Sequence, residues 1–233
     1  KLNSESNSVN IILFGPPGAG KGTQSNIISK EFNLKKISTG DLLRDEIKKD
    51  TIIGKKIKTI IDAGKLASDE IINSLIGEIL ENKIFYDRLI FDGYPRNLSQ
   101  AKNLTLLLEK HKQKISCVLS LKVNKDIIIK RILGRQICSN CGLIFNEYFN
   151  PPSNDVHKCD SSYLIKRADD NKKTVIERFE TYLEKTYPIL EYYKKQNLLK
   201  EINGESEIDQ IYKEIKGILT TLEAWLYNLY LYK

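Results

Sequence analysis

The sequence of 233 residues contains no methionine, one tryptophan and two histidines, and it has no long apolar run. A membrane-spanning helix needs about 20 predominantly apolar residues, so the sequence predicts no transmembrane segment and no membrane partner. The first residues, KLNSESNSV, are polar and look like neither a secretion signal nor an Arg-rich transit peptide. Because position 1 is not methionine, the initiator is missing and a trimmed targeting segment is compatible with the sequence. We therefore expect a cytoplasmic protein, with a mitochondrial location as the alternative.

Cysteine is also scarce, with four residues in the chain. Four cysteines in a chain of this length do not look like a disulfide framework, so a reducing compartment is expected. Cys117 lies within an apolar run and is expected in the core. The chain carries 37 Lys and Arg against 30 Asp and Glu, a net charge of +7. This balance fits nucleic acids, acidic membranes or phosphorylated small molecules, although most of the lysines are expected on a solvated surface.

Apolar runs rich in β-branched residues alternate along the chain with segments of helical spacing. The runs that predict strands lie at residues 9–14, 34–38, 88–92, 116–123 and 198–202. Helical spacing is clearest at 174–195 and from 208 onward, and we expect the aromatic terminal helix to pack on the core. Strands alternating with helices predict a parallel sheet covered on both faces. The stretch 137–167 breaks the alternation with two prolines and three cysteines, and it predicts a small inserted subdomain.

The clearest motif is a glycine-rich loop at residues 15–23, GPPGAGKGT. It follows a predicted strand and precedes a segment of helical spacing, which is the context of a phosphate-binding loop. In such a loop, backbone N–H groups and the helix N-terminus bind anionic oxygens together, and Lys21 can reach the outer phosphates. Gly22 stands where the usual pattern has Ser or Thr, and Thr23 follows it. A dinucleotide-binding loop fits less well, because the glycines do not fall at G-x-G-x-x-G.

An acidic residue, Asp92, ends the predicted strand at 88–92 and begins the motif DGYPR. In enzymes with a phosphate-binding loop, an acid at the end of a buried strand holds Mg²⁺ directly or through water. Gly93 and Pro95 break the strand and direct Arg96 toward the same end of the sheet. An Asp-Gly pair alone would be explained by a turn, but its position after the phosphate-binding loop favours a magnesium site.

A set of arginines supplies further positive charge: Arg44, Arg131, Arg135, Arg167 and Arg178. Phosphoryl transfer requires that two anionic substrates be held in line and that charge on the transferring group be neutralised. Planar, permanently charged guanidinium groups suit this task. Arg131 and Arg135 are four residues apart, so we expect both on one face of a helix. Any one of these arginines alone would be interpreted as a surface residue, but together they predict a phosphoryl-transfer site.

The chain resembles the adenylate kinases over nearly its whole length. The matching segments follow that family's order: GPPGAGKGTQ, ISTGDLLR, DAGKLASDE, FDGYPRN, RILGR, NPP and RADD. The resemblance implies an α/β fold of the P-loop NTPase type, with three layers and a five-stranded parallel sheet. It also implies a core domain formed by residues 1–37, 68–133 and 172–233, an AMP-binding insertion at 38–67 and a lid at 134–171.

The resemblance also implies which residues bind the substrates. The donor phosphates are expected at Gly18, Ala19, Gly20, Lys21, Gly22 and Thr23. The acceptor AMP is expected at Thr39, Arg44, Lys65, Leu66, Ala67, Gly93, Tyr94, Pro95, Arg96 and Gln100. The donor base is expected between Ile144 and Phe145, close to the backbone of Ser206.

The catalytic residues implied by the same resemblance are Lys21, Asp92, Arg96, Arg131, Arg135, Arg167 and Arg178. Arg131 and Arg135 would reach the donor from the base of the lid. Arg167 and Arg178 would bridge the acceptor phosphate and the transferring group, and Asp92 would organise the waters of Mg²⁺.

The implied activity is that of a nucleoside monophosphate kinase, which transfers a phosphoryl group reversibly from ATP to AMP in a Mg²⁺-dependent reaction. Transfer would be in line, without a phospho-enzyme, and by a monomer. The Gln100 amide can hydrogen-bond an adenine edge, and Thr39 and the long lid argue against a pyrimidine acceptor. The donor is less defined, because GTP:AMP phosphotransferases share nearly all these motifs. A remote alternative is a basic zinc-ribbon protein that binds nucleic acid, but the chain lacks the interleaved aromatic and basic residues of a base-stacking surface.

Three cysteines in the predicted lid have a spacing that suits a metal: Cys138, Cys141 and Cys159. The first two form a C-x₂-C pair, and thiolates at this spacing can hold tetrahedral Zn²⁺. Long-lid members of the family in some lineages carry such cysteines with a fourth Cys or Asp three residues after the third, where this chain has Ser162, a poor ligand. Asp160 or His157 could serve instead. The alternative is a lid without zinc that is held by hydrogen bonds.

Overall fold

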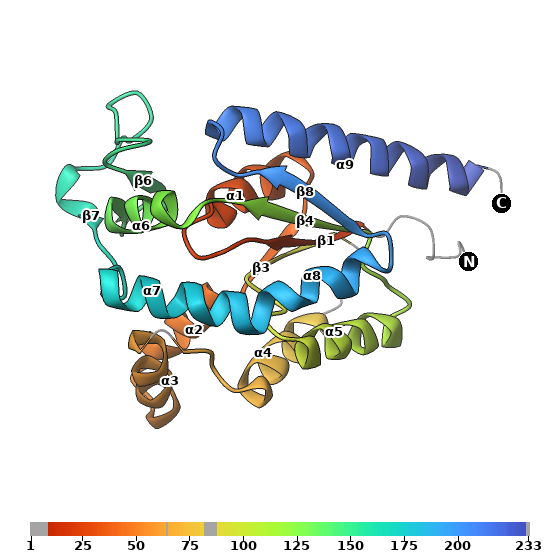
Figure 1. The fold of residues 1–233 in the computed structure, drawn as a ribbon, viewed down its shortest axis with the longest axis horizontal. Coiled ribbons are helices and arrows are strands. Elements are labelled where there is room, and N and C mark those ends of the chain that lie inside the picture. Colours follow the sequence, from red (N-terminus) through yellow and green to blue (C-terminus); the bar gives the residue numbers. More distant parts are fainter. Residues whose placement is uncertain (1–8, 64, 82–87, 232–233) are drawn as a thin grey trace.

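A computed structural model of the chain describes residues 9–63, 65–81 and 88–231. Its centre is a sheet of five strands in the order β2-β3-β1-β4-β8, and every neighbouring pair is parallel (Figure 1). The strands are β1 (Val9–Phe14), β2 (Lys35–Ser38), β3 (Arg88–Asp92), β4 (Cys117–Lys122) and β8 (Leu199–Asn203). Each strand boundary lies within one residue of its predicted position, and the predicted α/β fold of the P-loop type is confirmed.

Both faces of this sheet are buried, because alternate residues of the central strand β1 point into two separate cores. Ile12 and Phe14 pack into one core, and Ile11 and Leu13 pack into the other. A parallel sheet of this kind needs helices on each side. The helices α1 (Lys21–Glu31) and α9 (Ile208–Leu231) cover one face, and α4 (Asp69–Glu81), α5 (Leu98–Lys110) and α8 (Tyr187–Lys194) cover the other (Figure 1).

Two short helices follow β2 in the region predicted to bind AMP. They are α2 (Thr39–Lys48) and α3 (Ile52–Asp62), and they pack against each other at one side of the core (Figure 1). Each has a hydroxyl N-cap, since the Ser38 side chain accepts from Asp41 N and the Thr51 side chain accepts from Gly54 N. The boundaries of this insertion, 38–67, stay a prediction.

A second sheet, antiparallel and three-stranded, lies within the predicted lid. It consists of β5 (Arg135–Cys138), β6 (Ile144–Asn146) and β7 (Leu164–Ile165), in the order β6-β5-β7. It extends away from the core between α6 (Lys125–Leu133) and α7 (Lys172–Thr181) (Figure 1). The lid boundaries, 134–171, likewise stay a prediction.

The expectation that Arg131 and Arg135 share one helix face was wrong. Helix α6 ends at Leu133 and Gly134 is its C-cap, so Arg135 begins the strand β5. The ring of Tyr148 packs so closely on Gly134 that a Cβ there would lie 2.6 Å from it. A side chain at position 134 would require the Tyr148 ring to move, so glycine is what allows this close packing.

The segment 174–195, predicted from its helical spacing, is interrupted. Between α7 and α8 the residues Tyr182–Thr186 form a π-helical turn, so the two α-helices are joined without a loop. The helix α9 packs on the core through Ile211, Ile215 and Leu219. The side chains of the aromatic tail from position 227 onward lie outside the described residues, as do residues 1–8 and Gly64. Within the described ranges, no helix combines the length and the apolar character that crossing a bilayer requires.

Candidate active site

A cavity of about 760 Å³ opens at the carboxyl ends of the parallel strands. This end of an open α/β sheet is where such folds bind ligands, because the loops that leave neighbouring strands diverge there. The phosphate-binding loop follows β1, Asp92 ends β3, and Ser206 follows β8. The lining includes the complete predicted catalytic set, namely Lys21, Asp92, Arg96, Arg131, Arg135, Arg167 and Arg178.

The glycine-rich loop can bind an anion through its backbone. Gly18 and Gly20 have φ values of +79° and +95°, which favour glycine. A Cβ at Gly18 would lie 2.7 Å from the side chain of Ile132, so the loop also packs too closely for another residue. Helix α1 begins at Lys21, and no side chain within the described ranges caps it. Its first N–H groups are therefore free to bind the oxygens of a phosphate. Within this loop, Ala19 is fully buried.

Lys21 is the cation at the base of the cavity. Its Nζ donates to the carbonyls of Gly15 at 2.8 Å and Pro16 at 2.9 Å. Burial lowers the pKa of Lys21 to about 8, Asp92 opposes this shift, and the neighbouring Arg96 adds to it. A bound phosphate would add negative charge beside Lys21, so binding of a nucleotide should raise this pKa and stabilise the ammonium form.

Asp92 and Arg96 meet at the turn after β3. Asp92 is 8% exposed, and its Oδ2 accepts from the Ser25 hydroxyl at 3.1 Å. Gly93 has a φ of +76°, and its carbonyl accepts from Arg96 Nε at 2.7 Å and from Thr39 Oγ1 at 2.8 Å. These bonds fold Arg96 back over the turn toward the cavity. Burial, followed by repulsion from Arg178, lowers the pKa of Arg96 to about 10.

Three arginines of the cavity are held by carboxylates of the protein itself. The pairs are Arg44 with Asp41 at 2.5 Å, Arg135 with Asp170, and Arg178 with Asp169 at 2.6 Å. The Asp170 side chain is fully buried, and it contacts both Arg135 Nε and Nη2. A planar two-point contact of this kind is what a guanidinium also offers a phosphate. The carboxylates therefore hold these arginines in place.

Two further arginines face the cavity without such a carboxylate partner in the described part of the chain. Arg131 donates to the Gly204 carbonyl at 2.7 Å, and its guanidinium lies 5.5 Å from the centre of the Phe149 ring. Nε of Arg167 is buried without a hydrogen-bond partner. Burial, followed by repulsion from Arg135, lowers the pKa of Arg167 to about 10. Both arginines are thus available to an anionic ligand.

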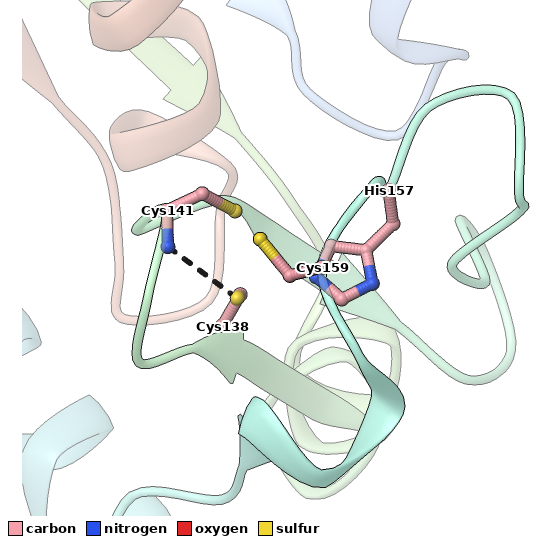
Figure 2. A group of neighbouring side chains, drawn as sticks. All are labelled: Cys138, Cys141, His157 and Cys159. Carbon is pink, nitrogen blue, oxygen red and sulfur yellow. Dashed lines mark hydrogen bonds between the residues drawn. The ribbon is translucent and has the colours of Figure 1, made fainter.

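The lid places four possible metal ligands together (Figure 2). The ligand atoms of Cys138, Cys141, His157 and Cys159 all lie within 4.8 Å of one another. Of the two residues considered as a fourth ligand, His157 joins this cluster. The Asp160 side chain instead accepts from Ser162 N and starts a short 3₁₀ helix.

The chemistry of this cluster suits a metal that prefers sulfur and nitrogen. The Cys138 thiol is fully buried in the structure, which raises its pKa, but a hydrogen bond from His157 and amide donation from Cys141 and Asn140 lower it to about 6 overall. A low pKa favours the thiolate, which is the form that binds metal. Three sulfurs and one imidazole are a tetrahedral zinc donor set. Cys117 lies apart from the cluster, buried in β4, and burial raises its pKa to about 11.

Comparison with known proteins decides the family. The model of the family described as "Adenylate kinase" matches residues 13–198 of this chain. The chain belongs to the adenylate kinase family. Similar proteins named adenylate kinase include that of Pelagibacter ubique, 50% identical over 211 residues that make up 91% of this chain and 99% of the relative. That of Petrotoga mobilis is 43% identical over 211 residues, which make up 90% of this chain and 96% of the relative. That of Archaeoglobus fulgidus is 38% identical over 218 residues, which make up 93% of this chain and 100% of the relative. The predicted family and enzyme class, a nucleoside monophosphate kinase, are confirmed.

Several residues that the adenylate kinase resemblance assigns to AMP do not line the large cavity. Thr39, Ala67, Tyr94 and Gln100 are buried, and Lys65 is exposed outside it. Leu66 and Pro95 line a separate small cavity of about 70 Å³ beside Arg96. Their contacts with AMP stay predictions.

Gln100 is already engaged within the protein. Its Oε1 accepts from Arg96 N at 2.8 Å, and its Nε2 donates to Asp69 Oδ1 at 2.8 Å. In this structure it therefore positions the turn that carries Arg96. Contact with an adenine edge would require at least one of these bonds to be exchanged.

The residues expected to contact the base of the donor nucleotide line the same cavity in this member of the adenylate kinase family. Ile144 and Phe145 on β6 and Ser206 after β8 all line the large cavity. The sequence interpretation missed Ile208, Ile211 and Phe149, which line it as well. It also missed Lys36, which lines the cavity too. The signal that could have found it is its position two residues before the end of β2, at the edge of the sheet where the site lies.

Proposed function

We propose that the chain is an adenylate kinase that transfers the terminal phosphoryl group of ATP to AMP, reversibly and with Mg²⁺, to give two ADP. One observation carries the proposal. The seven predicted catalytic residues come from well-separated parts of the chain, and all of them line one cavity beside the phosphate-binding loop. A structural or sensory protein would not require this convergence of a buried lysine and five arginines.

The residues have distinct tasks in this proposal. The backbone of residues 18–23 and Lys21 bind the donor phosphates, and Arg131 and Arg135 hold them from the side of the lid. Arg44 and Arg96 bind the acceptor phosphate. Arg167 and Arg178 lie between the two and neutralise the charge that develops on the transferring group. Carboxylates already orient Arg135 and Arg178, and backbone carbonyls orient Arg96 and Arg131.

Asp92 fits the role proposed for it with Mg²⁺. It is a carboxylate beside the phosphate-binding loop, next to the hydroxyl of Ser25. Mg²⁺ is commonly held by one or two carboxylates, by waters and by the substrate phosphates. When bound, the ion would bridge phosphate oxygens and neutralise part of their charge.

Closure of the predicted lid and AMP-binding part would exclude water, which would otherwise accept the phosphoryl group. The lid carries Arg135 at the start of β5, and Arg167 lies just beyond β7. Catalytic groups would therefore move with the lid, so that the complete site forms only around bound substrates. The boundaries proposed for the moving parts are 38–67 and 134–171.

ATP is proposed as the donor, with GTP as the alternative. The isoleucine and phenylalanine side chains of the cavity can contact either purine, so they do not distinguish ATP from GTP. The comparison with known adenylate kinases is what favours ATP. The test is a panel of ATP or GTP as donor against AMP, GMP, UMP and CMP as acceptors, with products separated by chromatography. The proposal requires ADP from ATP and AMP, and faster turnover with AMP than with the other monophosphates. A GTP preference would replace the donor, and no transfer at all would refute the function.

We also propose that the lid cluster binds one zinc ion through Cys138, Cys141, His157 and Cys159, with a structural role. The donor set and the proximity of the four ligand atoms support this. Elemental analysis of the purified protein should give about one zinc per chain. A metal content near zero after purification with added zinc would leave the hydrogen-bonded lid as the explanation.

A monomer in the cytoplasm is proposed for the working protein, with mitochondria as the alternative location. The family comparison does not favour the zinc-ribbon alternative, and no nucleic-acid partner is proposed. Light scattering after size exclusion should give the mass of one chain, 26.8 kDa. A stable dimer would contradict the proposed monomer.

A further inference from the structure

Lys36 places a positive charge beside the carboxylate proposed for magnesium. It lies on β2, and its Nζ is hydrogen-bonded to Asn26 Oδ1 at 2.8 Å. The same Nζ is 3.7 Å from Asp92 Oδ2 and 3.7 Å from Asp41 Oδ2. Lys36, Asn26, Asp41 and Asp92 all line the large cavity. The ammonium group is therefore held between two carboxylates at the place where the donor phosphates and their cation would meet.

Other cations also act on these carboxylates. Asp92 attracts Lys21 and Arg96, and Asp41 pairs with Arg44. Lys36 is the group whose Nζ lies within 4 Å of both Asp92 and Asp41. Without Lys36, Asp92 and Asp41 would face the same cavity with less positive charge between them. Two carboxylates with one fewer counter-ion attract a divalent cation more strongly.

A fixed positive charge attracts the two forms of a nucleoside triphosphate to different extents. The metal-free form is more negative by two charges than the magnesium complex. An ammonium group beside the phosphates therefore stabilises the metal-free form more, and it repels the divalent ion. The group changes the ratio of the two affinities even if the contacts with the base and the sugar stay the same.

We propose that Lys36 sets the metal selectivity of the donor site, by lowering its preference for the magnesium complex of the triphosphate over the metal-free triphosphate. This inference rests on the proposed function, because it assumes that the donor phosphates and Mg²⁺ occupy the cavity beside Asp92. Lys36 acts here through charge. Its one hydrogen bond to Asn26 fixes where that charge lies.

The expected effect is moderate, because the Lys36 side chain is 20% exposed and solvent screens part of the interaction. For Lys36→Gln we expect the ratio of Kd for metal-free ATP to Kd for MgATP to rise by about three- to tenfold. Glutamine can still hydrogen-bond Asn26, so the variant removes the charge and keeps a polar partner.

The experiment measures both dissociation constants by calorimetry on the full-length chain, with ATP in EDTA and with ATP in excess Mg²⁺. Lys36→Arg keeps the charge and is expected to keep the ratio within about twofold of the original protein. Lys216→Gln is the matched control, because Lys216 is an exposed lysine that pairs with Glu31 outside the cavity. It makes the same change in net charge and should leave the ratio unaltered.

The outcomes separate the inference from the proposed function. If the original protein binds both forms and Lys36→Gln keeps the original ratio, the inference is wrong and the proposed function stands. Equal weakening of both forms would assign Lys36 a structural role only, which also overturns the inference. If the original protein binds neither form of ATP nor of GTP, the proposed function itself fails. Thermal unfolding of each variant checks that the fold is retained.

Discussion

Raising the pH from 7.5 to 9.5 is expected to weaken the binding of a nucleoside triphosphate by about 20-fold. The effect arises at Lys21, whose pKa is lowered by burial to about 8 in this structure. Triphosphate oxygens around the ammonium group would return this pKa toward its ordinary value of 10.5. Protonation and binding therefore support each other, and affinity is lost once the pH rises above the pKa of the free protein.

The magnitude follows from the fraction of Lys21 that carries its proton. With a pKa of about 8, that fraction falls from about three quarters at pH 7.5 to about 3% at pH 9.5. With a bound-state pKa near 10.5, the complex stays about nine-tenths protonated at the upper pH. The ratio of these populations gives the change of about 20-fold, and binding at pH 8 should take up about half a proton.

The assay is calorimetry of ATP binding in Mg²⁺ between pH 7.5 and 9.5, in two buffers with different ionisation enthalpies. The difference between the buffers gives the proton uptake directly. Lys21→Arg is the control, since a guanidinium group stays charged over this range and its affinity should be nearly flat with pH. A change of less than threefold in the original protein would refute the assignment. An equal slope in Lys21→Arg would show that another group titrates.

Three substitutions test other parts of the site. Arg96→Ala should lower kcat by about 100-fold or more while the melting temperature changes little, because the side chain supplies positive charge to the cavity. Near-normal turnover in a coupled assay would remove Arg96 from the catalytic set. Asp92→Asn should abolish most of the magnesium dependence of ATP binding, which titrations with and without Mg²⁺ would measure, and an unchanged magnesium effect would place the ion elsewhere. Cys138→Ser should reduce zinc to well below one ion per chain and lower the melting temperature by several degrees, whereas full zinc content would exclude Cys138 as a ligand.

The parts of the fold that follow from local patterns could be predicted from the sequence. The run at 9–14 forms β1 because the sheet buries both of its faces, and the glycines at 18 and 20 adopt the positive φ values that their motif requires. Arg135 shows where spacing fails. A separation of four residues from Arg131 suggests one helix, but helix α6 ends at Leu133 and Gly134 is its C-cap, so Arg135 lies in the strand that follows.

Features that depend on tertiary packing were less accessible. His157 reaches the three cysteines only because the lid chain folds back on β5, and spacing alone did not distinguish it from Asp160. Lys36 looked like one of many surface lysines, and only the pairing of β2 with β3 brings it beside Asp92. Gln100 was assigned to adenine, yet its amide groups are bound to Arg96 and Asp69 in the structure.

The most direct test of the proposed activity is ³¹P NMR of the purified protein with ATP, AMP and Mg²⁺, together with Lys21→Ala prepared in the same way. The original protein should produce ADP until the three nucleotides reach equilibrium, and it should form ATP and AMP when it is supplied with ADP alone. Lys21→Ala should be slower by about 100-fold or more, which would exclude a contaminating kinase. No ADP from ATP or GTP with AMP, or equal rates in both preparations, would contradict phosphoryl transfer at this cavity.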